Sequence, residues 1–166
     1  MKVPFLDLSL QHRALREPAL AALAATYDAN RFCLGKDVED FERNFGAALG
    51  YPRVLGMNSG TSPLHVACMV AGFGPGDEVI TTPFTFAATT ETIVLLGGVP
   101  VYVDIDPATF NLCPQRLQEK LEQAAKTGRL PKVIIPVHMT GQPCDMQAIA
   151  DLAKPYGIRI LEDASH

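Results

Sequence analysis

The chain has 166 residues, enough to build the core of one ordinary domain. Hydrophobic residues make up 48% of it and charged residues 19%, a balance that excludes a disordered tail and suits a buried sheet. The net charge of −4 argues against nucleic acid as a partner, although a few oriented backbone amides can still hold a small anion.

The most apolar stretch, residues 92–103, is interrupted by Gly97, Gly98 and Pro100, so we expect no membrane span. The N-terminal residues carry no apolar signal core. Four cysteines lie far apart without a Cys-x-x-Cys pair: Cys33, Cys68, Cys113 and Cys144. This spacing favours reduced thiols in a cytoplasmic protein over a zinc site or a disulfide framework.

Two helices are predicted before any strand. Residues 10–29 are rich in Ala and Leu, and residues 37–49 place Val38, Phe41 and Phe45 at helical spacing before Gly50, a typical helix stop. The expected strands are 54–57, 78–81, 99–103, 133–137 and 158–161. They alternate with expected helices at 62–72, 85–96, 114–126 and 146–156, the last capped by Asp145.

Strands that alternate with helices predict an α/β fold, with a mainly parallel sheet and helices on both faces. No linker that would divide the chain into two domains is evident. The segment 72–77, Gly-Phe-Gly-Pro-Gly-Asp, superficially suggests a dinucleotide-binding loop. It precedes a strand instead of following one, so we interpret it as a turn.

The loop Asn58-Ser59-Gly60-Thr61-Ser62 lies between a predicted strand and a predicted helix. It offers a flexible glycine, hydroxyl groups and the amides of a helix N-terminus, which together form a ready phosphate site. A plain helix cap by Ser or Thr explains the same residues equally well. The loop is not a Walker A motif, because the Gly-Lys-Ser/Thr sequence is missing.

Candidate residues also follow two later strands. Phe84 and Phe86 come after residues 78–81, where one of them could stack on a flat ring or both could belong to the core. Glu162 and Asp163 are neighbours at the end of the last strand and therefore face opposite ways. One carboxylate there could hold a protonated ring nitrogen, a ribose hydroxyl or a metal, or cap a following helix.

The remaining polar candidates are weaker. Asp104 and Asp106 could share one face and bind Mg²⁺, but Asp106-Pro107-Ala108-Thr109 is typical of a turn, and we predict no metal site. His12, His65 and His138 lack ligand spacing and are expected to be structural. His166, three residues after Asp163, is the histidine predicted to be functional.

Seven segments, in order along the chain, resemble the DegT/StrS-type sugar aminotransferases, which are fold-type I pyridoxal-phosphate enzymes. They are residues 4–8, 35–42, 58–65, 74–80, 82–89, 136–143 and 162–166. Each segment alone is a weak signal, but seven in the family's order are specific. The resemblance implies the incomplete large domain of a fold-type I transferase, with residues 1–166 as its N-terminal segment and first part.

The resemblance also implies a site for pyridoxal 5'-phosphate. Gly60, Thr61 and Ser62 would hold the cofactor phosphate, and Phe86 would stack on the pyridine ring. Asp163 would pair with the ring nitrogen and keep it protonated. His166 matches a family position near the phenolic oxygen of the cofactor and is the catalytic candidate.

By the same resemblance the substrates are a nucleotide-linked keto sugar and an amino-acid donor, glutamate in the family's usual reaction, in polysaccharide or antibiotic biosynthesis. The full-length enzyme would be a homodimer. The family's Schiff-base lysine and the remainder of the large domain would follow His166, so the 166-residue chain alone is expected to be inactive and poorly stable. A sugar dehydratase on the same scaffold and a non-catalytic regulatory protein are the alternatives.

Overall fold

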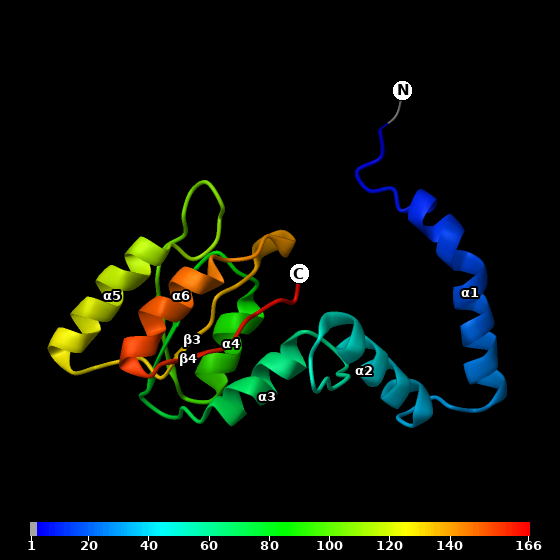
Figure 1. The fold of residues 1–166 in the computed structure, drawn as a ribbon, viewed down its shortest axis with the longest axis horizontal. Helices are drawn as coiled ribbons and strands as arrows, with labels where there is room; N and C mark the ends of the chain where they lie inside the picture. The colour runs from blue at the N-terminus through cyan, green and yellow to red at the C-terminus, as the bar shows by residue number, and fades with distance from the viewer. Residues whose placement is uncertain (1–2) are drawn as a thin grey trace. The chain divides into compact units, whose positions relative to one another are not determined.

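The computed structural model describes residues 3–166 (Figure 1). Its contacts divide the chain into two compact units, with the division between Gly56 and Met57. No linker in the sequence marks this division.

The first unit consists of two helices and their connections. Helix α1 spans Ser9–Asp28 and helix α2 spans Lys36–Leu49, each within one residue of its predicted start and end. Helix α2 ends at Gly50, which adopts a left-handed conformation with φ of 75°, as glycine does after many helices. Within α2 the rings of Phe41 and Phe45 lie 5.5 Å apart, so the predicted helical face exists.

The predicted strand at 54–57 is wrong, because this segment has no regular secondary structure. A strand exists only where a neighbour accepts and donates its backbone hydrogen bonds. The amide of Gly56 instead donates to the Oε1 atom of Glu42, 2.7 Å away. The residues of this segment favour a strand, but no neighbouring strand pairs with them in the described structure.

The second unit is built on a parallel sheet of four strands. They are β1 (Glu78–Thr81), β2 (Val99–Tyr102), β3 (Val133–Ile134) and β4 (Arg159–Ile160), in the order β2-β1-β3-β4. Every pairing is parallel. A further parallel bridge joins Val137 to Asp163, so the chains leaving β3 and β4 stay side by side.

Helices cover both faces of this sheet (Figure 1). They are α3 (Thr61–Ala71), α4 (Ala87–Leu95), α5 (Pro114–Thr127) and α6 (Met146–Ala153), with short 3₁₀ turns at Met139–Gly141 and Lys154–Tyr156. Successive strand residues point to opposite faces. Ile80 and Ile134 are therefore buried under α5 and α6, and Val79 and Val133 under α3 and α4. The predicted α/β class is confirmed.

Two local predictions are also confirmed. Asp145 caps α6, since its Oδ1 atom accepts the amide of Ala148 at 3.0 Å. The glycine-rich segment before β1 is a turn, in which Asp77 accepts the amide of Gly74 at 3.0 Å. None of the helices in residues 3–166 is both long and apolar enough to cross a bilayer.

Candidate functional site

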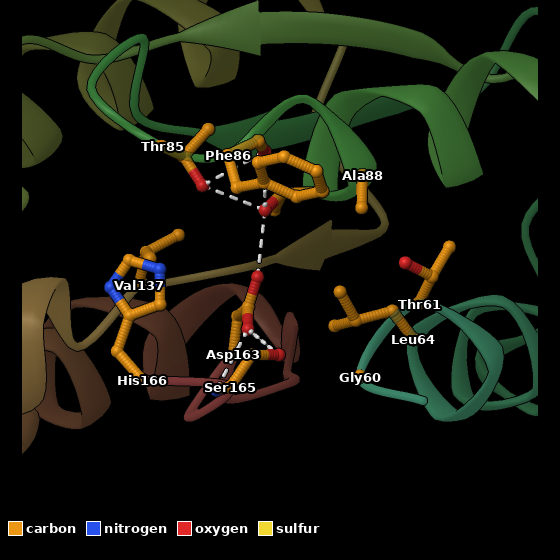
Figure 2. Close-up of a pocket in the computed structure, with 11 residues that line it drawn as sticks. Gly60, Thr61, Leu64, Thr85, Phe86, Ala88, Val137, Asp163, Ser165 and His166 are labelled. Carbon is orange, nitrogen blue, oxygen red and sulfur yellow. Dashed lines mark hydrogen bonds between the residues drawn. The ribbon is translucent and has the colours of Figure 1, made fainter. Parts of the chain in front are cut away.

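A cavity of about 260 Å³ lies at the carboxyl end of the sheet, within the second unit (Figure 2). Five of the six predicted site residues line it: Gly60, Thr61, Phe86, Asp163 and His166. Ser62 is not among the lining residues. In an open parallel sheet this edge is where ligands bind, so the topology places the cavity as expected.

Asp163 is the buried charge of the cavity, with 4% of its surface exposed. Its backbone pairs with the segment that follows β3, because its amide donates to Pro136 (2.9 Å) and its carbonyl accepts from the amide of His138 (3.0 Å). Burial of an ionised carboxylate is costly unless donors surround it. The donors around Asp163 therefore matter more than its position alone.

Three donors of the protein reach this carboxylate. The hydroxyl of Thr89 donates to Oδ2 at 2.7 Å, and the amide and hydroxyl of Ser165 donate to Oδ1 at 3.2 and 2.7 Å. The hydroxyl of Thr85 lies 2.7 Å from that of Thr89, which extends the chain of hydrogen bonds toward the surface. Figure 2 shows these contacts around Asp163.

The N-terminus of α3 forms another part of the cavity wall. Gly60 precedes the helix and Thr61 is its first residue, so the amides at this end have no acceptor within the helix. The hydroxyl of Ser59 accepts the amide of Ser62 at 3.2 Å, and the two serine hydroxyls are 3.1 Å apart. Ser59 thus caps the helix, while Gly60 and Thr61 line the cavity. Of the two explanations offered by the sequence, the helix cap is present in the structure, and the anion site stays a prediction.

Phe86 lies directly before α4, and 67% of its surface is exposed. It therefore does not belong to the core and lines the cavity instead (Figure 2). Phe84 has a different neighbour, since its ring lies 5.8 Å from that of Phe110. Of the two phenylalanines, only Phe86 is available to cover a ligand in this cavity.

His166 is oriented by one backbone contact. The amide of Thr140 donates to its Nδ1 atom at 3.0 Å. Because Nδ1 is the acceptor, the neutral ring carries its proton on Nε2, which remains a donor. Thr140 itself has a left-handed φ of 53°, an uncommon conformation for a residue with a side chain.

A buried asparagine holds this turn in place. The side chain of Asn111, with 3% exposure, donates to the carbonyl of Gln142 at 2.8 Å and accepts the amide of Met139 at 3.2 Å. Both ends of its amide are therefore used to fix the turn that contains Thr140. The sequence analysis did not single out Asn111.

The other polar candidates have structural contacts. His138 accepts the amide of Cys144 on Nδ1 (3.1 Å) and so donates from Nε2 to Glu162 (2.9 Å). Glu162 is thus engaged by His138, while its neighbour Asp163 lines the cavity. Asp106 accepts the amide of Ala108 at 2.7 Å, as its predicted turn requires. Over the described residues, no group of three or more His, Cys, Asp or Glu side chains could hold a metal ion.

Three polar lining residues were missed as individual candidates: Thr85, Thr89 and Ser165. Thr85 and Thr89 stand four residues apart around a predicted helix start, a spacing that puts both hydroxyls on one face. That spacing was the available signal. Ser165 offered none, because its contact with Asp163 depends on how the chain bends after β4.

Burial also affects a thiol near this site. Cys68, a residue of α3, is fully buried against α4 and the sheet, and burial raises the pKa of its thiol. The negative charge of Asp163 adds to this effect. The thiol contacts the hydroxyl of Thr92 at 3.9 Å. A protonated thiol in this place is a packing group and not a nucleophile.

The sequence matches a model of the DegT/DnrJ/EryC1/StrS aminotransferase family over residues 13–166. A protein named "Pleiotropic regulatory protein" from Geobacillus stearothermophilus is 42% identical over 99% of this chain and 43% of its own length. A Pseudomonas aeruginosa protein named UDP-2-acetamido-2-deoxy-3-oxo-D-glucuronate aminotransferase is 41% identical over 98% of this chain and 44% of its own length.

Solved structures also resemble this chain over most of its length and less than half of their own. A DegT DnrJ EryC1 StrS aminotransferase from Brucella abortus superposes with a TM-score of 0.90 at 36% identity, over 97% of this chain and 43% of that one. NtdA from Bacillus subtilis, with bound cofactor PMP, superposes with a TM-score of 0.85 at 34% identity, over 98% of this chain and 36% of that one. The chain thus spans less than half the length of these relatives.

Proposed function

The chain belongs to the DegT/DnrJ/EryC1/StrS aminotransferase family, and from this premise we propose that it is part of an enzyme that moves an amino group to a nucleotide-linked keto sugar. Glutamate is the proposed donor and pyridoxal phosphate the proposed cofactor. A relative named for an aminotransferase of a UDP-linked 3-oxo sugar supports the acceptor class. A family structure with bound PMP supports the cofactor.

One observation carries this proposal: a single small cavity joins a buried carboxylate, Asp163, to the N-terminus of α3. Pyridoxal phosphate needs a negative partner for its ring nitrogen and a positive end for its phosphate. A carboxylate and a helix N-terminus supply these two kinds of partner.

The local shape also fits a bound group. A Cβ atom on Gly60 would lie 3.0 Å from the hydroxyl oxygen of Ser165, so the absence of a side chain at Gly60 allows this part of the cavity wall to lie close to Ser165. An ionised carboxylate has about four acceptor positions. Thr89 and Ser165 fill three of those on Asp163, which leaves acceptor capacity for a ligand N–H.

Each predicted site residue then has a role. Gly60 and Thr61 would hold the phosphate through their amides and the Thr61 hydroxyl at the start of α3. Ser62 does not line the cavity and donates its amide to Ser59, so its predicted role in phosphate binding would require a change in these contacts. Phe86, exposed at the cavity, would cover one face of the ring and exclude water from it. His166, which carries its proton on Nε2, would donate a hydrogen bond to the phenolic oxygen.

Asp163 is the residue that makes the chemistry effective. When bound, pyridoxal phosphate supplies an electron sink for the pair left behind as the substrate loses its α-proton. Asp163 would keep a proton on the ring nitrogen, because the negative charge of its carboxylate favours the protonated ring. The buried position strengthens this electrostatic contact, since water does not screen it.

Further elements of the enzyme lie beyond these residues in this proposal. The chain covers 43% of the length of a family structure, so in this proposal a Schiff-base lysine and the remainder of the large domain would come from outside residues 1–166. The complete enzyme would act as a homodimer in the cytoplasm.

A second candidate function is regulation without catalysis. It is favoured by the relative named "Pleiotropic regulatory protein", which is 42% identical to this chain. A regulatory protein could bind the cofactor at the same cavity and still transfer no amino group. The two candidates therefore differ in turnover and not in cofactor binding.

The experiment uses the protein at its natural length, purified from its own gene. We expect it to bind pyridoxal phosphate and, with glutamate, to convert the bound cofactor to its amino form with release of 2-oxoglutarate, detected by mass spectrometry. Cofactor binding without release of 2-oxoglutarate would favour the regulatory candidate. A protein that binds no pyridoxal phosphate would contradict both.

A further inference from the structure

Thr89 and Asp163 are 74 residues apart in the sequence but share a hydrogen bond of 2.7 Å from Oγ1 to Oδ2. Thr89 lies in α4, is 1% exposed and lines the cavity. We infer that Thr89 is a positioning residue that holds the carboxylate of Asp163 in place toward the ring nitrogen of the cofactor. This inference rests on the proposed function.

The direction of the hydrogen bonds follows from the donors present. The amide of Ser165 can only donate, so Oδ1 of Asp163 must accept. An ionised carboxylate has no proton to give, so the hydroxyl of Thr89 donates to Oδ2. Since Thr89 has one hydroxyl proton, the hydroxyl of Thr85, 2.7 Å away, donates to Thr89 in turn.

The result is a chain of donors that runs one way, from Thr85 through Thr89 to Asp163 (Figure 2). Hydrogen bonds in such a chain polarise one another and strengthen the contact with the charged end. Ser165 already occupies Oδ1 with two donors. Thr89 is therefore the group that fixes Oδ2, the oxygen on which acceptor capacity for the cofactor remains.

Without the hydroxyl of Thr89, Oδ2 would face an apolar methyl group in a buried place. The ionised form would lose one of its three donors, and the carboxylate could turn about its side-chain bond. Both effects weaken the contact with a protonated ring nitrogen. The protonation of that nitrogen is thus a readout that a purely structural role of Thr89 would not change.

The test compares two threonines of the same helix. Thr89→Val removes the hydroxyl at Asp163. Thr92→Val makes the same change one helical turn later, where Thr92 is equally buried but donates only to the carbonyl of Thr89. Thr89→Ser restores a hydroxyl at the first position. The protein at its natural length is freed of cofactor and titrated with pyridoxal phosphate labelled with ¹⁵N in the ring.

We expect Thr89→Val to weaken pyridoxal-phosphate binding by roughly 10- to 100-fold and to shift the ring ¹⁵N signal toward the unprotonated form. Thr89→Ser and Thr92→Val should stay within about threefold of the natural protein, a change too small to reflect loss of a charged hydrogen bond. If Thr89→Val does not fold, the comparison of Thr89→Ala with Thr89→Ser tests the inference instead. We expect the same difference in cofactor binding and in the ring ¹⁵N signal between these two variants.

Equal binding and an equal ring signal in the natural protein and Thr89→Val would overturn the inference while leaving the proposed function intact. The same loss in Thr92→Val would also overturn it, because the effect would then belong to the helix and not to the contact with Asp163. A natural protein that binds no pyridoxal phosphate would overturn the proposed function and the inference together.

Discussion

Gly60 lies so close to Ser165 that a methyl group on Gly60 would be 3.0 Å from the serine hydroxyl oxygen and 3.2 Å from its Cβ. The φ of Gly60 is −67°, which any residue can adopt, so the constraint is one of space and not of backbone conformation. The start of α3 and the segment after Asp163 therefore lie too close together for an added side chain at Gly60 to fit without a shift of Ser165.

We therefore predict that Gly60→Ala destabilises the fold by about 1–3 kcal/mol, as overpacking does, and weakens cofactor binding. Urea unfolding and a pyridoxal-phosphate titration measure the two effects. Gly74→Ala is the matched control, because nothing lies within 4 Å of a Cβ there. Equal effects at Gly60 and Gly74 would contradict this explanation.

Asp163→Asn tests the role of the buried charge. The amide has nearly the same shape, so the fold should survive, but it cannot keep the ring nitrogen protonated. We predict that transamination by the protein at its natural length falls roughly 100-fold or more, measured as 2-oxoglutarate released from glutamate. Glu162→Gln is the control one residue earlier, engaged by His138 at 2.9 Å and outside the cavity, and it should retain activity. Comparable losses in both variants would refute the assignment.

The sequence predicted most of the fold because helices and buried strands carry their own periodicity. The bounds of β1 agree with the prediction, and those of α5 differ by one residue. The segment 54–57 fails because β-forming residues do not reveal whether a neighbouring strand is present to pair with them. Predicted strands 133–137 and 158–161 shorten to two residues each for a related reason: pairing, not composition, sets their length.

The candidate site was also predicted only in part: its main residues were candidates, but the contacts that orient them were not. Glu162 and Asp163 were predicted as candidates because they follow a strand at the ligand-binding edge of a parallel sheet, and the family resemblance selected Asp163. Gly60 was predicted from its place before a helix N-terminus, although the strand expected before it does not form. The contacts that orient them, from Thr89 and Ser165, depend on tertiary packing between α4 and the segment after β4. No local pattern records a hydrogen bond between residues 74 positions apart.

Two buried thiols should resist modification in the folded protein. Burial raises the pKa of Cys68 and of Cys144 above the ordinary thiol value. We predict that iodoacetamide modifies the exposed Cys33 at pH 8 while Cys68 and Cys144 react only after denaturation, as read by peptide mass spectrometry. Equal rates for buried and exposed thiols in the native protein would count against this prediction.

The same pKa shifts affect stability at high pH. The unfolded state releases its thiol protons near the ordinary pKa of about 8.5, whereas the folded state retains them. The folded state then binds more protons, so the free energy of unfolding falls as the pH rises above that value. Replacing Cys68 by Ala should reduce this fall in urea melts between pH 8 and 10. An unchanged dependence of the free energy of unfolding on pH in Cys68→Ala would contradict this prediction.

The cap of α6 gives a prediction about stability alone. Asp145→Ala removes the side-chain oxygen that accepts the amide of Ala148, so we expect a loss of about 1 kcal/mol in the free energy of unfolding. Asp151→Ala, on an exposed position of the same helix, is the control and should cost less than about 0.5 kcal/mol. Thermal unfolding of both variants measures the difference. Equal losses would mean that net charge and not capping is responsible.

Asn111 should control the orientation of His166 from a distance. Its amide fixes the turn through the carbonyl of Gln142 and the amide of Met139. That turn presents the Thr140 amide to Nδ1 of His166. Asn111→Ala leaves two backbone groups without their partner and removes buried contacts, so we predict a loss of about 2–4 kcal/mol in stability. Without the fixed turn, the strained φ of 53° at Thr140 should also relax.

The decisive measurement for Asn111 is the tautomer of His166, read from its imidazole ¹⁵N shifts in the folded protein. We expect the natural protein to carry the neutral proton on Nε2, because Nδ1 accepts from Thr140, and Asn111→Ala to show a mixture of both tautomers. Thr127→Ala is the control, since that hydroxyl bonds only to carbonyls of its own helix. A single unchanged tautomer in folded Asn111→Ala would mean that the Thr140 contact holds without Asn111.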